Sequence, residues 1–210
     1  MQYPRKCHSS CVVANRYVVC TGSVFEGNRA DATTELYDTQ DDTWMELARL
    51  NTPRCFHSSC DRNGEFVYVF AGKSKIGRAI NSVERMKIKD ENGMSWRNQW
   101  MKLELPAHEF PDLFSPRSTP GVCAVSDRDL LLFGGRVNGK SLSDYYLIST
   151  YPQTGGFKDI KKHTITIYDE ETPIWPYEVT TISDTSSRIA YTVDWMTKRL
   201  FMFKDGKFDF

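Results

Sequence analysis

The chain has 210 residues, of which 40 % are hydrophobic and 26 % are charged, a composition typical of a folded domain rather than of a disordered segment. Lysine plus arginine equals aspartate plus glutamate at 27 each, so no net charge favours nucleic acid or an anionic membrane surface. The longest apolar runs, such as Leu130 to Phe133, are far shorter than the roughly twenty residues of a membrane helix. Six cysteines are too few for a disulfide-built scaffold, and the first residues lack the apolar core of a secretory signal, so we expect a cytoplasmic protein.

One motif recurs three times. The stretch "PRKCHSSC" at residues 4–11 reappears as "PRCFHSSC" at 53–60 and, more distantly, as "PRSTPGVC" at 116–123. Eleven or twelve residues after the last cysteine of each motif comes a pair that ends in glycine: Thr21-Gly22, Ala71-Gly72 and Gly134-Gly135. A repeat of this length indicates that the chain is an array of similar structural units.

Each unit predicts four short strands. The segments "CVVANRYVVCTG", "CDRNGEFVYVFAG" and "CAVSDRDLLLFGG" are two apolar runs around a polar turn, which is typical of a β-hairpin. A third strand is predicted in "TTELYD", "SVERMKI" and "DYYLIS", and a tryptophan then follows in the first two units, at Trp44 and Trp100. We expect both tryptophans to pack between neighbouring units.

The pattern weakens after residue 150. The alternating "HTITIYDEE" predicts the outer strand of the third unit. Four more strand-like runs, in "EVTTIS", "RIAYTVDW" and "KRLFMFKDGKFDF", are separated by turns at Asp184, Met196-Thr197 and Asp205-Gly206. They predict a divergent fourth unit.

Four strands in each unit of roughly fifty residues, with a glycine pair after the second strand and a tryptophan on the fourth, resemble the kelch-repeat β-propeller family. The Pro-Arg pairs, the "FGG" at 133–135 with its weaker relatives "CTG" and "FAG", and the two tryptophans carry the resemblance. It implies an all-β fold of about four propeller blades, at residues 1–50, 51–106, 112–172 and 173–210. Kelch propellers close with five to seven blades, so we expect a portion of a larger ring, the alternatives being blades from another chain or a small four-bladed ring.

The clusters of cysteine and histidine within residues 7–11 and 55–60 allow a zinc site as one interpretation. Their spacing lacks a CxxC pair, however, and in the third unit Pro120 replaces the histidine while Cys123 remains. We therefore interpret the cysteine as a small core residue on the first strand of each unit, and we predict no metal site and no cofactor.

A catalytic interpretation would use His57 and Ser58 beside Cys60, but no third group is apparent that would orient the base or stabilise an oxyanion. The glycine pairs precede strands, not helices, so they are not phosphate-binding loops. We predict no catalytic residue and no enzymatic activity.

The loops after the glycine pairs are the predicted binding surface, because propellers gather such loops at one end and loops on a rigid scaffold often carry recognition. Our candidate binding residues are Phe25, Arg29, Lys73, Lys75, Arg78, Arg136 and Lys140. A rim of basic side chains would attract an acidic protein surface, with Phe25 and Ile76 as apolar anchors. The alternative is that these loops are simply solvated.

An insertion separates the second and third units and contains "DENGMSWRN" and "PAHEFPDLFSP". The second segment combines Phe110, Leu113 and Phe114 with acidic residues, a composition suited either to docking on a neighbour or to packing on its own blade.

Together these features predict a non-catalytic protein-interaction or scaffold module in a eukaryotic cytoplasm, whose partners are other proteins and not nucleic acid or membranes. Two alternatives follow from the resemblance: the substrate-recognition part of a kelch-type ubiquitin-ligase adaptor, and a structural component of a cytoskeletal or ciliary assembly.

Overall fold

The computed structural model describes eight segments of the chain: residues 1–25, 29–90, 93–103, 115–164, 179–184, 189–194, 199–205 and 207–209. Their secondary structure consists of antiparallel β-strands and turns, so the predicted all-β class is confirmed. In the part of the chain that is described, no helix has the length and apolar character needed to cross a membrane. The segment with Phe110, Leu113 and Phe114 lies outside the described residues.

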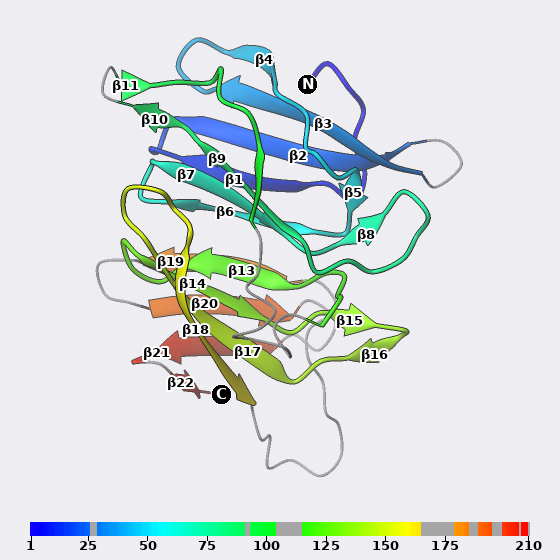
Figure 1. The fold of residues 1–210 in the computed structure, drawn as a ribbon, viewed down its shortest axis with the longest axis vertical. Coiled ribbons are helices and arrows are strands. Elements are labelled where there is room, and N and C mark those ends of the chain that lie inside the picture. Colours follow the sequence, from blue (N-terminus) through cyan, green and yellow to red (C-terminus); the bar gives the residue numbers. More distant parts are fainter. Residues whose placement is uncertain are drawn as a thin grey trace.

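Four sheets, each of four strands, make up most of the structure (Figure 1). The first sheet contains β1 (Ser9–Val13), β2 (Tyr17–Phe25), β3 (Arg29–Asp38) and β4 (Thr43–Leu47). The second contains β6 (Ser58–Arg62), β7 (Phe66–Phe70), β9 (Val83–Lys87) and β12 (Met101–Leu103). The third contains β13 (Gly121–Ala124), β14 (Asp129–Phe133), β17 (Asp144–Thr150) and β18 (Phe157–Thr164). The fourth contains β19 (Val179–Asp184), β20 (Ile189–Asp194), β21 (Arg199–Lys204) and β22 (Lys207–Asp209).

Three two-stranded ribbons lie outside these four sheets. They pair β5 (Arg54–Cys55) with β8 (Lys73–Ser74), β10 (Lys89–Asp90) with β11 (Gly93–Met94), and β15 (Arg136–Val137) with β16 (Lys140–Ser141). The strands β8, β15 and β16 lie on the same edge of the molecule, at the right in Figure 1. Two of the three predicted binding loops therefore do gather at one end.

The four sheets stack in chain order. Their first strands lie side by side, with β1 against β6, β6 against β13 and β13 against β19. Because successive side chains of a strand point to opposite faces, the middle sheets can bury both faces. Val67 and Val69 of β7 pack on the first sheet, whereas Tyr68 and Phe70 of the same strand pack on the third. This arrangement explains why all five residues of β7 are buried.

The third sheet repeats this two-sided packing. Leu130 and Leu132 of β14 face the second sheet, and Leu131 and Phe133 face the fourth, where they share a core cluster with Phe203. The predicted cysteines follow the same rule: Cys60 and Cys123 are buried on the first strands of their sheets. The interpretation as core residues is confirmed for these two, whereas Cys11 of the first unit is only half-buried.

One expectation about an individual element is wrong, and another is covered only in part by the described residues. The outer strand of the third sheet, β18, begins at Phe157, before "HTITIYDEE", pairs with β17 and buries Ile160. It includes His163 and Thr164 of that run, whose remaining residues lie outside the described part of the chain. Trp100 packs between the first two sheets and donates its Nε1 hydrogen bond to the Ala48 carbonyl at 2.9 Å. Trp44, in contrast, is half-buried beside Tyr37 of its own sheet, on a face that none of the other described sheets covers.

Glycines allow close backbone contacts at a register shift within β2 and just after the ends of β7 and β14. Gly22, Gly72 and Gly135 have φ of +60°, +101° and +91°, and a methyl group at any of them would lie within 3.0 Å of another residue's carbonyl oxygen. A side chain at these positions would therefore meet both strained backbone and steric overlap.

We predict that Gly72→Ala lowers the free energy of unfolding by about 1–3 kcal/mol more than Gly77→Ala does. Both glycines have positive φ, at +101° and +77°, so both substitutions carry a backbone cost of about 1 kcal/mol. Only Gly72 has neighbours, the Cys55 carbonyl oxygen and the His57 Cβ, both 2.7 Å from the added methyl. Urea unfolding of the two variants measures the difference, and equal losses would contradict the close-approach argument.

Candidate functional site

A buried arginine clamps each of the first three sheets, and it is the arginine of the Pro-Arg motif. Arg5 pairs with Glu35 at 2.9 Å, Arg54 with Glu84 at 2.7 Å, and Arg117 with Asp144 at 2.8 Å. The three arginine side chains have no exposed surface. Burial of a charge requires such a partner, because an unpaired charge in the interior costs several kcal/mol.

Each clamp also holds the end of the second strand. Arg5 donates from Nη1 to the Gly22 carbonyl at 2.8 Å, Arg54 to the Ala71 carbonyl at 2.9 Å and Arg117 to the Gly134 carbonyl at 2.8 Å. These acceptors belong to the three pairs that the sequence repeat places after each cysteine. One guanidinium therefore joins the Pro-Arg motif, the glycine pair and the third strand of its sheet.

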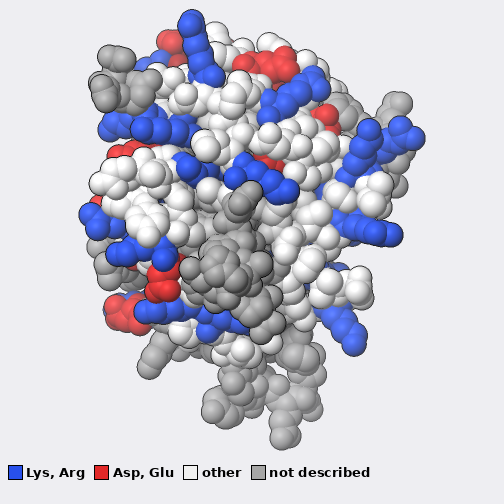
Figure 2. Space-filling view, viewed as in Figure 1, with Lys and Arg blue, Asp and Glu red and all other residues white. Residues whose placement is uncertain are grey.

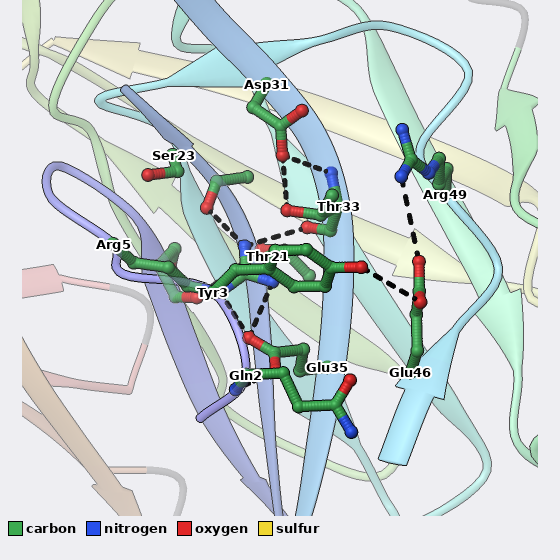
Figure 3. Close-up of polar contacts among 12 residues, drawn as sticks. Gln2, Tyr3, Arg5, Thr21, Ser23, Asp31, Thr33, Glu35, Glu46 and Arg49 are labelled. Carbon is green, nitrogen blue, oxygen red and sulfur yellow. Dashed lines mark hydrogen bonds and ion pairs between the residues drawn. The ribbon is translucent and has the colours of Figure 1, made fainter. Parts of the chain in front are cut away.

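Backbone donors complete the first two clamps. Figure 3 shows Gln2, Tyr3 and Arg5 lying over the strands that carry Glu35 and Glu46. The Gln2 amide donates to Glu35 Oε1 at 2.6 Å, while the Tyr3 hydroxyl donates to Glu46 at 3.3 Å. In the second sheet the Asn51 and Thr52 amides donate to Glu84 in the same way, at 2.6 and 2.9 Å.

The third clamp uses a shorter spacing along the chain. Its carboxylate, Asp144, lies two residues before Tyr146, which occupies the position that Glu84 has in the second sheet. A shift of two residues keeps the side chain on the same face of the strand. Burial opposes ionisation of Asp144, but the hydrogen bonds and the charge of Arg117 outweigh it and lower the pKa of that carboxyl.

We predict that Arg54→Leu lowers the free energy of unfolding by about 3–5 kcal/mol, because it leaves the Glu84 carboxylate buried without its cation. The double variant Arg54→Leu, Glu84→Leu should lose less than the sum of the two single variants, since neither charge then remains. Arg16→Leu is the control, because the Arg16 side chain that pairs with Asp38 is 32 % exposed, so its loss should cost less than that of the fully buried Arg54. Urea unfolding gives all four values; a loss for Arg54→Leu no larger than for Arg16→Leu would contradict the clamp.

Burial favours the neutral forms of the first-strand thiols and of the His57 imidazole. Burial raises the pKa of Cys11 and Cys60 and raises that of Cys123 to about 12, which disfavours the reactive thiolate. Burial and the charge of Arg54 hold the pKa of His57 well below its usual value, and His57 Nε2 is hydrogen-bonded to Thr21 Oγ1 at 2.8 Å. Within the described residues no three His, Cys, Asp or Glu side chains form a group suited to a metal ion.

A central hollow of about 740 Å³ lies where the strands β1, β6 and β13 converge, and Asp61 of β6 lines it. Burial raises the pKa of Asp61 to about 6, against the opposing effects of the Gly64 amide, which donates to Asp61 Oδ2 at 2.9 Å, and of Arg62. Other groups lining the hollow include Lys89 and the three motif cysteines. The folded chain therefore holds this proton more tightly than the unfolded chain.

We predict that Asp61 makes the chain less stable as pH rises from about 4 to 6, because the folded state releases its proton only at the higher pH. Above pH 6 the stability lost through ionisation of Asp61 is not regained. Asp61→Asn removes this ionisation, so it should raise the free energy of unfolding by about 1 kcal/mol at pH 7 but not at pH 4. Asp205→Asn, at an exposed position, is the control. Urea unfolding at both pH values tests this, and an equal gain at both would contradict the raised pKa.

A line of backbone hydrogen bonds joins the sheets at the end where the loops gather. The third residue after each motif proline, namely Cys7, Phe56 or Thr119, has a φ between 52° and 55°. The Phe56 amide donates to the Cys7 carbonyl at 2.9 Å, and the Thr119 amide donates to the Phe56 carbonyl at 2.7 Å. This conformation turns Phe56 and Thr119 toward the loops of β8 and β15.

These residues form part of a second hollow, of about 830 Å³, which we call the basic hollow. It is lined by Phe56, Lys73, Gly77, Arg78, Ala79, Pro116, Ser118, Thr119, Arg136, Val137, Asn138 and Gly139. Three of these residues are cationic and none is acidic. Figure 2 shows Lys and Arg side chains along the same edge of the molecule.

The basic hollow contains three of the seven candidate binding residues. Lys73 Nζ lies 5.2 Å from the centre of the Phe56 ring, and Arg136 donates from Nη2 to the Gly139 carbonyl at 2.7 Å. Arg78 is exposed on the same loop as Lys73. The structure therefore brings Lys73, Arg78 and Arg136 together around one concave surface.

The other four candidates do not line the basic hollow. Lys75 and Lys140 are exposed on the β8 and β16 loops, and Arg29 is exposed at the start of β3. Phe25 ends β2, where its backbone pairs with Arg29, and its side chain is outside the described part of the structure. Ile76, the second proposed anchor, is 74 % exposed.

Sequence reasoning missed Phe56 and Thr119 as lining residues. They hold the same position in the second and third motifs, three residues after the proline, where Cys7 stands in the first. That shared position was visible in the repeat, but the positive φ that directs these residues toward the loops was not.

No protein-family model matches the chain, and a search of curated proteins finds no significant relative. The function must therefore be argued from the geometry.

Proposed function

We propose that the chain is a portion of a kelch-type β-propeller and serves as a non-catalytic protein-interaction module that binds an acidic segment of a partner protein in the basic hollow. The repeated motif and the four stacked antiparallel sheets support the propeller. We place its action in a eukaryotic cytoplasm, in keeping with the free cysteines.

The observation that carries the binding proposal is the composition of the basic hollow. Lys73, Arg78 and Arg136 line it together with apolar and neutral polar residues. Charge-assisted hydrogen bonds from arginine to a carboxylate are stronger than neutral ones, and a basic surface speeds encounter with an acidic one. The hollow therefore suits carboxylate side chains better than neutral polar ones.

The hollow also offers apolar contact. Phe56, Pro116 and Val137 lie among the cations, so an acidic residue flanked by an apolar one would fit better than a purely acidic run. The Lys73 ammonium group lies over the Phe56 ring, and the electron density of the ring face attracts it.

The loops that present these residues have ordered backbones. The Ser74 amide donates to the Arg78 carbonyl and the Gly77 amide to the Ser74 carbonyl, both at 2.8 Å. On the other side the Arg136 amide donates to the Ser118 carbonyl at 2.8 Å. Such preorganisation lowers the entropy lost on binding.

We predict that Lys73→Gln, Arg78→Gln weakens binding of an acidic peptide at least about tenfold, since two charge-assisted hydrogen bonds are lost. The probe is an array of synthetic peptides in which every Asp- and Glu-containing sequence is paired with its Asn and Gln counterpart. The strongest binder is then measured by fluorescence anisotropy at two salt concentrations, and affinity should fall at the higher one.

Lys75→Gln is the matched control, because Lys75 belongs to the same loop but does not line the hollow. It should leave the affinity nearly unchanged. No preference for acidic peptides, or an equal loss in the control, would sink the proposal.

A further inference from the structure

The three contacts between neighbouring sheets obey one rule. In the first contact the face of the first sheet with Val19 and Leu36 covers the face of the second sheet with Val67 and Met86. In the next contact the opposite face of the second sheet covers the third, and the opposite face of the third covers the fourth. We call the face of a sheet on the side of the preceding sheet its leading face. The opposite face, on the side of the following sheet, is its trailing face.

On the leading faces of the second and third sheets the central residues are buried. Val67 and Met86 are 0 % exposed, as are Leu130 and Ile148 of the third sheet. Val67 sits opposite Met86, and Leu130 sits opposite Ile148, on the second and third strands of their sheets. Asp61 and Ala124 of the first strands complete the two cross-strand rows. The same row of the first sheet can be identified from the strand register.

That row of the first sheet consists of Val12, Val18, Tyr37 and Trp44, which are paired in register across β1, β2, β3 and β4. All four are apolar or aromatic, like their counterparts in the third sheet. Val12 nevertheless is 59 % exposed, and the other three are only half-buried. The leading face of the first sheet therefore has the chemistry of a covered face, and none of the described sheets lies over it.

The fourth sheet shows the complementary situation. Ala190 and Phe203 point toward the third sheet and are buried there. The next residue of β20, Tyr191, and the preceding residue of β21, Met202, are paired in register and point to the opposite, trailing face. Tyr191 is 41 % exposed, and Met202 is half-buried.

We propose that two copies of this chain associate head to tail, with the trailing face of the fourth sheet of one copy covering the leading face of the first sheet of the other. The contact continues the three sheet-to-sheet contacts within the chain, and it would bury Tyr191 and Met202 against Val12, Val18 and Tyr37. Such a contact is heterologous, so it produces either a closed ring or an open chain of copies. It does not involve the basic hollow.

The test is the molar mass in solution, measured by sedimentation and by size-exclusion chromatography with light scattering, over about 1–200 µM, where weak interfaces populate. We expect association that increases with concentration. Val12→Lys and Tyr191→Lys should each raise the dissociation constant at least about tenfold, because each places a charge in the apolar contact. Both side chains are exposed in the single copy, so circular dichroism should show unchanged folding.

Mixing the two variants separates a head-to-tail contact from a symmetric one. Val12→Lys retains an intact trailing face, and Tyr191→Lys retains an intact leading face, so the mixture should form a one-to-one dimer although neither variant associates alone. Arg78→Gln, in the basic hollow, should associate like the unmodified chain. A monomer at every concentration, association that neither substitution weakens, or a mixture that stays monomeric would overturn the proposal.

Discussion

The buried arginine of the Pro-Arg motif is the interaction on which the rest of the structure depends. Its guanidinium pairs with a carboxylate of the third strand and donates to carbonyls at the end of the second, as Arg54 does with Glu84 and Ala71. A buried ion pair need not add much net stability, but separating it is costly. A register slip of one residue would point Glu84 to the other face and leave Arg54 uncompensated. The clamp therefore acts chiefly on register, while the apolar faces supply most of the stabilisation.

The clamp also determines where the binding loops begin. Lys73 and Arg136 are the residues that directly follow Gly72 and Gly135, and the carbonyl just before each of these glycines is held by an arginine, Arg54 or Arg117. Two of the cations of the basic hollow thus lie two residues after a carbonyl that is held in place. Loops form the hollow, yet Lys73 and Arg136 lie close to the backbone carbonyls that Arg54 and Arg117 hold in place. This explains how short ribbons can present charges at defined positions.

Much of this fold could be predicted from the repeat, and what was missed has a common physical origin. The hairpins, the glycine pairs and the buried cysteines depend on neighbours in the sequence, so local pattern was enough. The carboxylate partners lie thirty residues after Arg5 and Arg54 and twenty-seven after Arg117, and this unequal spacing hid the correspondence. Of the candidate site, the cations of the basic hollow were predicted, whereas Phe56 and Thr119 were missed because backbone conformation and the adjoining unit place them there.

The two surfaces of the molecule depend on different residues, and this has a consequence for how substitutions act. Side chains on the faces, such as Val67 and Leu130, hold one sheet on the next, so they affect the stability of the whole array as in other repeat architectures. Exposed side chains on the loop edge, such as Arg78, contribute to none of the core clusters. Changes at the edge can therefore alter recognition while the stack is preserved. Substitutions on the leading face of the first sheet belong to neither group. Val12 is exposed in a single copy, so its substitution should affect stability only when another sheet covers it.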